Sequence, residues 1–357
     1  MAVLKSDVLK IVVYVGASLL LGATLAPWLY NFGMGIAEVT ATKETNGLIR
    51  WLGESARDSK DNFPRFFDRS LLLSAFLLLF PLLAWLRIGR PPGSYRDTPW
   101  SLRLPDAVVV SDRGQPLRRN PDGWLQALFG FVLAGGLLLV SGWVLVRSGF
   151  FVWRDAEVST QGAPNPAPQA IEWARAMRKA LPTALVVSVI EEVLFRGVLL
   201  GIFLRAMRAG PAILSLSFLF AFAHFLEPPV GATVPDPEAL DAGFVLLGQI
   251  FARFADPLEF LSRFAVLWAV GIVLGIARWR TASLWLPVGL HAGWVFCFAL
   301  FKAATWPVPG LPPETRWLVG MTLLEGVLPL VVVAITGIVV AMLTRSRDPL
   351  EPDPMRP

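Results

Sequence analysis

Long apolar segments recur along the whole chain and are separated by polar stretches. A helix of about 20 apolar residues spans the ~30 Å hydrocarbon core of a membrane, and most of these segments reach or approach that length. We therefore expect an all-α fold, a polytopic transmembrane helical bundle of about eight transmembrane helices. The expected helices cover residues 8–30, 70–86, 124–146, 181–204, 211–226, 262–277, 282–301 and 317–343.

The composition agrees with a membrane protein. Hydrophobic residues make up 55% of the chain and charged residues 17%, whereas soluble domains contain roughly a quarter charged residues. The net charge of +5 does not indicate a nucleic-acid partner, because the basic residues are scattered among short loops. We expect membrane lipids around the chain and no nucleic acid.

The distribution of Lys and Arg predicts the orientation in the membrane. With the N-terminus inside, the loop 87–123 lies inside with seven arginines, and the acidic loop 227–261 lies outside. The loops 31–69 and 147–180 also fall outside, although they contain six and five basic residues. We expect both termini to be cytoplasmic.

A proline-rich stretch, 161–168, cannot be helical and gives the best internal boundary. It predicts N-terminal transmembrane helices with long polar loops over 1–180 and a helical core over 181–301. The last transmembrane helix and a disordered tail then occupy 302–357.

The loop 227–261 contains a periodic apolar pattern of its own. Phe244, Leu247, Phe251 and Phe254 recur at spacings of three and four residues. This pattern predicts a helix over 241–255, either amphipathic and lying in the membrane interface or short and buried.

Two adjacent glutamates and an arginine interrupt the apolar run 181–203. A charge at the centre of a membrane helix costs about 2.5 to 3.5 kcal/mol, so such residues are functional candidates. At helical pitch, Glu192 and Arg196 are about 40° apart, whereas Glu191 and Arg196 are about 140° apart. We expect Arg196 to neutralise Glu192 and to leave Glu191 as a general base. The alternative is a buried ion network that only holds helices together.

The two histidines of the chain, His224 and His291, both fall in expected membrane helices. Helix rise places Glu191 about 15 Å, His224 about 10 Å and His291 about 16 Å below the outer face. These three groups can polarise a water molecule, either through a bound zinc ion or by direct hydrogen bonding without a metal. Hydrolysis is the reaction that this set favours.

The residues around His291 indicate how its helix packs. Pro287 removes one hydrogen bond within the helix, and Gly289 and Gly293 form a G-x-x-x-G face. We expect a kinked helix in close contact with a neighbour, which would position His291.

Three motifs follow one another in the second half of the chain: E-E-V-L-F-R at 191–196, F-A-F-A-H at 220–224 and L-H-A-G-W at 290–294. They resemble, in order, the E-E-x-x-x-R, F-x-x-x-H and later histidine motifs of the CPBP family of intramembrane proteases. That family groups CaaX prenyl endopeptidases with bacterial relatives linked to bacteriocin processing and self-immunity. The resemblance covers roughly 181–301.

The resemblance implies an intramembrane endopeptidase of the CaaX-protease-like type in a bacterial inner membrane. Its substrate would be a peptide or a prenylated-peptide-like molecule. Glu191 would activate the attacking water, and Glu192 and Arg196 would support it. His224 and His291 would bind the water, a metal or the developing oxyanion. A zinc ion, if the enzyme uses one, would be held by Glu191, His224 and His291.

One position departs from the family pattern. The family commonly has Asn or Asp four residues after the last histidine, and this chain has Val295. Either Gln249, Ser283 or a backbone N–H serves the oxyanion, or catalysis is weakened or lost. A noncatalytic membrane immunity or scaffold protein that retains the polar site is therefore the alternative function. A proton-coupled transporter is a third candidate, although the sequence contains no inverted repeat.

Overall fold

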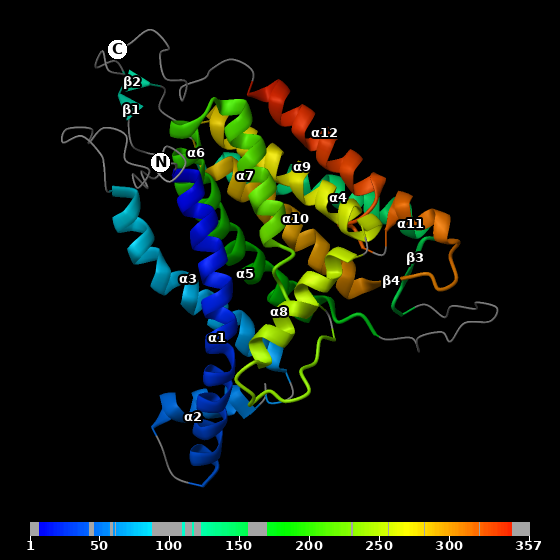
Figure 1. Ribbon diagram of the computed structural model, residues 1–357. Coiled ribbons are helices and arrows are strands. Elements are labelled where there is room, and N and C mark those ends of the chain that lie inside the picture. The colour runs from blue at the N-terminus through cyan, green and yellow to red at the C-terminus, as the bar shows by residue number, and fades with distance from the viewer. Residues whose placement is uncertain are drawn as a thin grey trace. The chain divides into compact units, whose positions relative to one another are not determined.

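The computed structural model describes residues 7–344 except 43–45, 58–59, 61, 88–108, 111–115, 118–122, 156–169, 230, 256, 282 and 321 (Figure 1). The chain divides into two compact units. The first unit contains Met1–Tyr95 and Phe222–Pro257, and the second contains Arg96–Ala221 and Leu258–Pro357.

Four helices in the described ranges are long and apolar enough to cross a membrane. They are Leu9–Thr42, Gly123–Arg147, Phe260–Thr281 and Trp285–Ala304. Shorter apolar helices cover Ala209–Ala223, Ala242–Ala252 and Val327–Leu343. The protein is an all-α membrane protein, as the hydrophobic pattern predicts.

The first unit contains helices and no strand in its described part, and a loop covers 224–229 and 231–241. It contains α1 (Asp7–Thr42), α2 (Gly47–Arg57), α3 (Phe63–Arg87), α8 (Ala242–Ala252) and the 3-10 turn Arg253–Ala255. The Ser70 hydroxyl donates a 2.7 Å hydrogen bond to the Gly22 carbonyl and so links α3 to α1. Helix α8 lies directly against α1 at Gly243, because a Cβ at this position would collide with the Ala23 carbonyl.

The expected loop 31–69 is largely helical, which corrects the sequence-based interpretation. Helix α1 continues to Thr42, and α2 lies within the same region. At 1.5 Å per residue, the 36 residues of α1 extend about 54 Å, well beyond a ~30 Å hydrocarbon core. Hydropathy identifies the part of a helix that suits lipid and misses polar extensions of the same helix.

The helix expected over 241–255 is present as α8 and the turn that follows it. One face of this helix is buried and includes Gly243, Leu246 and Ile250. This face agrees with the expectation of a short buried helix. Of the residues that predicted the helix, Leu247 is buried and Phe254 stacks on Phe222, whereas Phe244 and Phe251 are exposed.

The second unit contains most of the helices and all the strands in the described part of the chain. A helical pair, α4 (Gly123–Arg147) and α10 (Trp285–Ala304), lies beside α5 (Trp173–Glu192) (Figure 1). The remaining helices are α7 (Ala209–Ala223), α9 (Pro257–Thr281), α11 (Pro313–Val319) and α12 (Val327–Leu343).

Two short antiparallel ribbons complete the second unit. Strands β1 (Val109–Val110) and β2 (Pro116–Leu117) form the first ribbon. Strands β3 (Phe151–Trp153) and β4 (Thr305–Pro307) form the second, with Trp153 opposite Thr305. Because β3 follows α4 and β4 follows α10, the second ribbon ties the ends of these two helices together.

The helix expected over 181–204 is longer than predicted and changes its winding. Helix α5 begins at Trp173 because the residues after it, A-R-A-M-R-K-A, are good helix formers that hydropathy does not detect. It continues into a π-helical segment, η3 (Val193–Leu199), and then α6 (Leu200–Ala206). The Leu200 N–H donates to the carbonyl of Phe195, five residues earlier.

The single helix expected over 317–343 is wrong, because the structure has α11 and α12 instead. Gly320 and Gly326 interrupt it with φ angles of 69° and 94°. This left-handed backbone region ends a right-handed helix and favours glycine.

Helices α4 and α10 approach each other through glycines, as the G-x-x-x-G face predicts. A Cβ at Gly289 would collide with the Ala127 carbonyl, and one at Gly293 would collide with the carbonyl of Phe131. Pro287 lies in the first turn of α10, where an N–H has no partner within the helix. The proline therefore fits the start of this helix rather than kinking its middle.

Several predictions fall outside the described residues. These are the proline-rich boundary at 161–168, the C-terminal tail at 348–357 and most of the basic loop 87–123. The division into the regions 1–180, 181–301 and 302–357 stays a prediction.

Candidate active site

Glu192 is the centre of a buried polar network in the second unit. Its Oε1 accepts a 2.9 Å hydrogen bond from Nη1 of Arg196 and lies 2.8 Å from Nδ1 of His291. All three side chains are buried. The pairing of Glu192 with Arg196 is the one expected from their spacing, whereas the contact with His291 was not predicted.

The partner of Nδ1 determines the tautomer of His291. A carboxylate oxygen can only accept a hydrogen bond, so we assign the proton of the neutral ring to Nδ1. The Nδ1–H group then donates a hydrogen bond to Oε1 of Glu192. In the neutral imidazole, Nε2 is then an acceptor. The network therefore presents a basic nitrogen on the other edge of the ring.

Glu191 lies on this other edge. Its Oε2 is 3.9 Å from Nε2 of His291, and its side chain is 27% exposed, whereas that of Glu192 is 0% exposed. Adjacent residues on a helix point about 100° apart, which gives the two carboxylates different surroundings. Glu192 is enclosed by its partners, and the Glu191 side chain is partly exposed although its Oε2 is buried.

Arg196 is fixed by more than its ion pair. Its Nη2 donates a 3.2 Å hydrogen bond to the Gly271 carbonyl of α9, and its own carbonyl accepts a 3.3 Å hydrogen bond from Nε of Arg278. The residue lies in the π-helical segment, a feature that is frequent at functional sites. Helix α9 thus holds both ends of this arginine.

The packing of α10 explains why His291 reaches α5. His291 is two residues from Gly289 and from Gly293, so it points about 160–200° away from the face that touches α4. Trp173, at the start of α5, packs against Trp153 of β3. Trp153 pairs with Thr305 of β4, and Thr305 directly follows α10. The start of α5 therefore lies near the end of α10, and the two helices are antiparallel.

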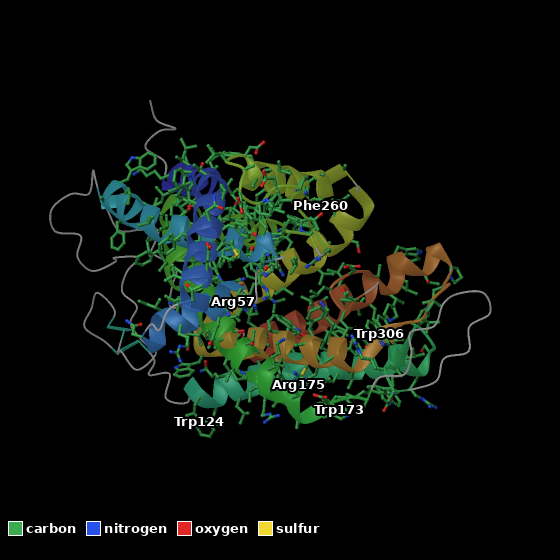
Figure 2. All side chains as sticks on the ribbon, turned by 90° about the horizontal axis from the view of Figure 1, so that it is seen from below. Arg57, Trp124, Trp173, Arg175, Phe260 and Trp306 are labelled. Carbon is green, nitrogen blue, oxygen red and sulfur yellow. The ribbon has the colours of Figure 1, made fainter. Side chains whose placement is uncertain are left out.

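Figure 2 shows the same arrangement from below. Trp173 and Arg175, at the start of α5, lie toward the end of the unit that carries Trp306 of β4. Trp124, at the start of α4, lies toward the opposite end. The two carboxylates at the other end of α5 are 18 and 19 residues from Trp173, about 27 to 29 Å along the helix, and therefore well away from this ribbon.

His224 is not among the residues that the second unit brings together. It follows directly after α7 and belongs to the first unit, where it is partly buried. Of the five predicted site residues, the second unit therefore assembles Glu191, Glu192, Arg196 and His291. The role of His224 stays a prediction.

A catalytic zinc ion usually has three protein ligands in addition to water. Of the expected ligands, the second unit supplies Glu191 and His291. Among the described residues, no group of three or more His, Cys, Asp and Glu side chains forms a metal site. The donors of this unit alone do not fit a catalytic zinc.

The two side chains considered for the oxyanion are engaged elsewhere. Nε2 of Gln249 donates a 2.8 Å hydrogen bond to the Thr233 carbonyl within the first unit. The Ser283 hydroxyl accepts a 3.2 Å hydrogen bond from the Trp285 N–H at the start of α10. Neither takes the place that an Asn or Asp at position 295 would occupy.

Two buried polar atoms near the network were missed by the sequence-based interpretation. The Ser188 hydroxyl and the Trp294 indole N–H have no hydrogen-bond partner among the described residues. Ser188 is one turn before Glu192 on α5, and Trp294 is nearly one turn after His291 on α10. Because the helices are antiparallel, both positions lie on the same side of the Glu192–His291 contact. Serine and tryptophan are ordinary in apolar helices, so the sequence carried no signal.

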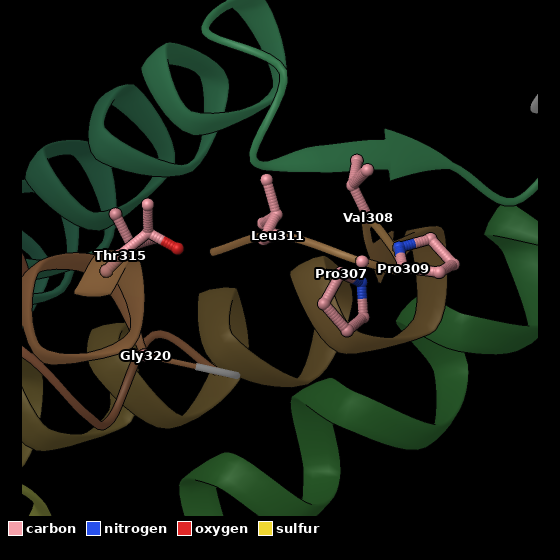
Figure 3. A pocket seen from close by; sticks show the side chains of 8 residues that line it. Pro307, Val308, Pro309, Leu311, Thr315 and Gly320 are labelled. Carbon is pink, nitrogen blue, oxygen red and sulfur yellow. The ribbon is translucent and has the colours of Figure 1, made fainter. Parts of the chain in front are cut away.

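A separate pocket of about 350 Å³ lies between β4 and the end of α11 (Figure 3). Its lining has one side-chain hydroxyl and no ionisable side chain. It is lined by Pro307, Val308, Pro309, Gly310, Leu311, Thr315, Val319 and Gly320. None of the predicted site residues contributes to it.

Comparison with known proteins supports the resemblance drawn from the motifs. Residues 173–297 match the family described as type II CAAX prenyl endopeptidase Rce1-like. The matched region contains the two glutamates, the arginine and both histidines. Comparisons with curated proteins and with solved structures gave no match. The segment 173–297 is therefore similar to the Rce1-like family, in agreement with a CPBP-type intramembrane protease.

Proposed function

We propose that the protein is an intramembrane endopeptidase in which Glu191 activates the water that attacks the peptide bond. The observation that carries the proposal is the 3.9 Å separation between Oε2 of Glu191, a buried atom of a partly exposed side chain, and Nε2 of His291. The Rce1-like region supports a protease that acts on a peptide substrate in a membrane.

The proposed chemistry needs only groups of the second unit. A water molecule between the two atoms directs one O–H at Glu191 and the other at Nε2 of His291, which leaves a lone pair for attack. Its oxygen bonds to the carbonyl carbon while Glu191 takes its proton. The resulting tetrahedral intermediate then breaks its C–N bond, and the proton passes from Glu191 to the departing amine.

Glu192 and Arg196 serve this reaction indirectly. Glu192 holds Nδ1–H of His291 and thereby keeps Nε2 available as an acceptor. Arg196 compensates the charge of Glu192, which no water would otherwise solvate. We propose that both are positioning residues and that Glu191 and His291 contact the reacting atoms.

The developing oxyanion needs hydrogen-bond donors. We propose that the Ser188 hydroxyl and the Trp294 indole N–H are the oxyanion donors. They become available when a bound substrate separates α5 from α10 near these two residues. Both donors are buried and have no partner in the described part of the chain, so they are available to a substrate oxygen. They would replace the side chain that the family commonly has at the position of Val295.

The proposed function is tested with purified protein in proteoliposomes and an internally quenched peptide that ends in a farnesylated Cys-a-a-X sequence. Glu191→Gln should reduce kcat by about 10²- to 10⁴-fold, because the amide cannot take a proton from water. Glu172→Gln is the matched control, since Glu172 immediately precedes α5 and is exposed. It should cleave like the wild type.

Undiminished cleavage by Glu191→Gln would remove the proposed general base. The alternative, a noncatalytic immunity or scaffold protein, is favoured by Val295, which places an apolar side chain one turn after His291. In that case the wild type would cleave no farnesylated or unmodified peptide, although the polar network would still be intact.

A further inference from the structure

Phe220 is the first residue of the F-x-x-x-H motif, and the proposed function does not use it. It lies in the last turn of α7 and is 1% exposed. A buried phenylalanine is usually a packing residue. The partners of this one are unusual, because its ring contacts two members of the polar network.

The first partner is Arg196. Its guanidinium carbon lies 4.4 Å from the centre of the Phe220 ring, well within the range of a cation–π interaction. Phe195 also flanks this guanidinium, but at 5.8 Å. Because Arg196 is shielded from water, the negative face of the Phe220 ring replaces part of its lost hydration.

The second partner is His291. The two ring centres are 6.0 Å apart and the planes meet at 78°, an edge-to-face arrangement. Such a contact restricts rotation of the imidazole about its bond to Cβ. That rotation determines whether Nδ1 faces Glu192 and Nε2 faces Glu191.

Arg196 and His291 share one acceptor, Oε1 of Glu192, and they also share the Phe220 ring. The ring therefore contacts both donors that fix this oxygen. It is contributed by α7, whereas the donors come from the segment after α5 and from α10.

We infer that Phe220 is a positioning residue whose ring holds Arg196 and His291 on Glu192 and so aligns the imidazole with Glu191. This inference rests on the proposed function for its catalytic consequence. The cation–π contact itself does not depend on any activity. Phe220 thus acts through the network and does not touch the substrate.

The test replaces Phe220 with phenylalanines that bear one, two or three ring fluorines. Fluorination weakens the negative face of the ring stepwise and changes its volume little. With the farnesylated quenched peptide, kcat should fall stepwise to about a tenth of the wild-type value, while KM stays unchanged. The melting temperature in detergent should fall over the same series.

The matched control is the same series at Phe301, a buried ring in α10 that packs edge-on against Phe151. This series tests the effect of fluorine in a packed ring that makes no cation–π contact among the described residues. We expect kcat to be unaffected there.

The outcomes separate this inference from the proposed function. A flat kcat across the Phe220 series would overturn the positioning role, even if the melting temperature fell. An equal loss of kcat at Phe301 would overturn it as well, because packing alone would then explain the effect. If the wild type cleaves no peptide, the proposed function fails. The cation–π contact is tested separately, because a melting temperature that does not change with fluorine at Phe220 would refute it.

Discussion

Nδ1 of His291 and Oε1 of Glu192 lie 2.8 Å apart, and this same oxygen also accepts a hydrogen bond from Arg196. A single buried carboxylate oxygen thus joins the helix of His291 to the helix of the two glutamates. The adjacent glutamates consequently have separate tasks, because Glu192 is occupied by the protein and Glu191 is partly exposed.

Glu192→Gln should destabilise the protein far more than Glu191→Gln. Loss of the Glu192 charge leaves Arg196 buried without its counter-ion, which typically costs about 3 to 5 kcal/mol. Thermal unfolding of both variants in detergent measures the difference. A melting temperature of Glu192→Gln equal to that of the wild type would mean that the pair is not needed for folding.

Gly293→Ala should lower both stability and kcat. The added methyl group would collide with the carbonyl of Phe131, and overpacking of this kind costs about 1 to 3 kcal/mol. Helix α10 must then move away from α4, and His291 moves with it. Activity and thermal unfolding of the purified variant measure the two effects.

Gly136→Ala is the control for this substitution. A Cβ at Gly136 meets no atom within 4 Å, although the residue lies on the same helix, α4, that Gly293 contacts. This variant should be as stable and active as the wild type. If Gly293→Ala behaved in the same way, the glycine contact would not be what sets the position of α10.

Ser188→Ala and Trp294→Phe should each reduce kcat by about 10²-fold, which is the usual loss for one oxyanion donor. Ser188→Ala should not lower the melting temperature, because it removes a buried polar group that has no partner among the described residues, and Trp294→Phe should lower it only slightly, through the ring atoms that it loses. Val295→Asn, introduced into either variant, supplies another donor and should restore part of the lost kcat.

Ser141→Ala is the matched control, since its buried hydroxyl already donates to the Leu138 carbonyl in α4. It should leave kcat unchanged. A strongly reduced melting temperature for Ser188→Ala or Trp294→Phe, without rescue by Val295→Asn, would assign these groups to structure and not to the oxyanion.

Cleavage should persist after exhaustive dialysis against a chelator, because the second unit brings together Glu191 and His291 rather than three metal ligands. Metal content of the wild type, His224→Ala and His291→Ala is measured by mass spectrometry alongside activity. Stoichiometric zinc in the wild type that is lost from either variant would establish the zinc site predicted from the sequence instead.

The local part of the site was predictable because it depends on helix geometry alone. Residues four apart on a helix are neighbours, and the pairing of Glu192 with Arg196 follows from that spacing. The similar membrane depths of Glu191 and His291 also agree with the 3.9 Å separation between their side chains. Both inferences needed only the rise and the pitch of a helix.

The contact between Glu192 and His291 was not predictable, because it depends on how α10 is rotated. Gly289 and Gly293 set that rotation by their contact with α4. The G-x-x-x-G pattern indicates close packing but does not identify the neighbouring helix. Spacing in the sequence likewise gives no indication that the ring of Phe220 lies against Arg196 and His291.

The extents of the helices were the least predictable part of the fold. Hydropathy located the apolar centres of α1 and α5 but not their polar ends. The helices continue through these ends because the polar residues there have favourable helix propensities. The break between α11 and α12 depends on two glycines with positive φ, and a continuous apolar pattern conceals it.

The π-helical turn between α5 and α6 makes the length of this segment as important as its composition. Such a turn amounts to one extra residue in an otherwise regular helix. One further residue between Gly197 and Leu199, wound as regular helix, would turn α6 by about 100° relative to the glutamates, whereas deletion of one residue would let the helix wind regularly with α6 facing nearly as before. Homologous chains should therefore tolerate changes of residue type in this turn more readily than insertions.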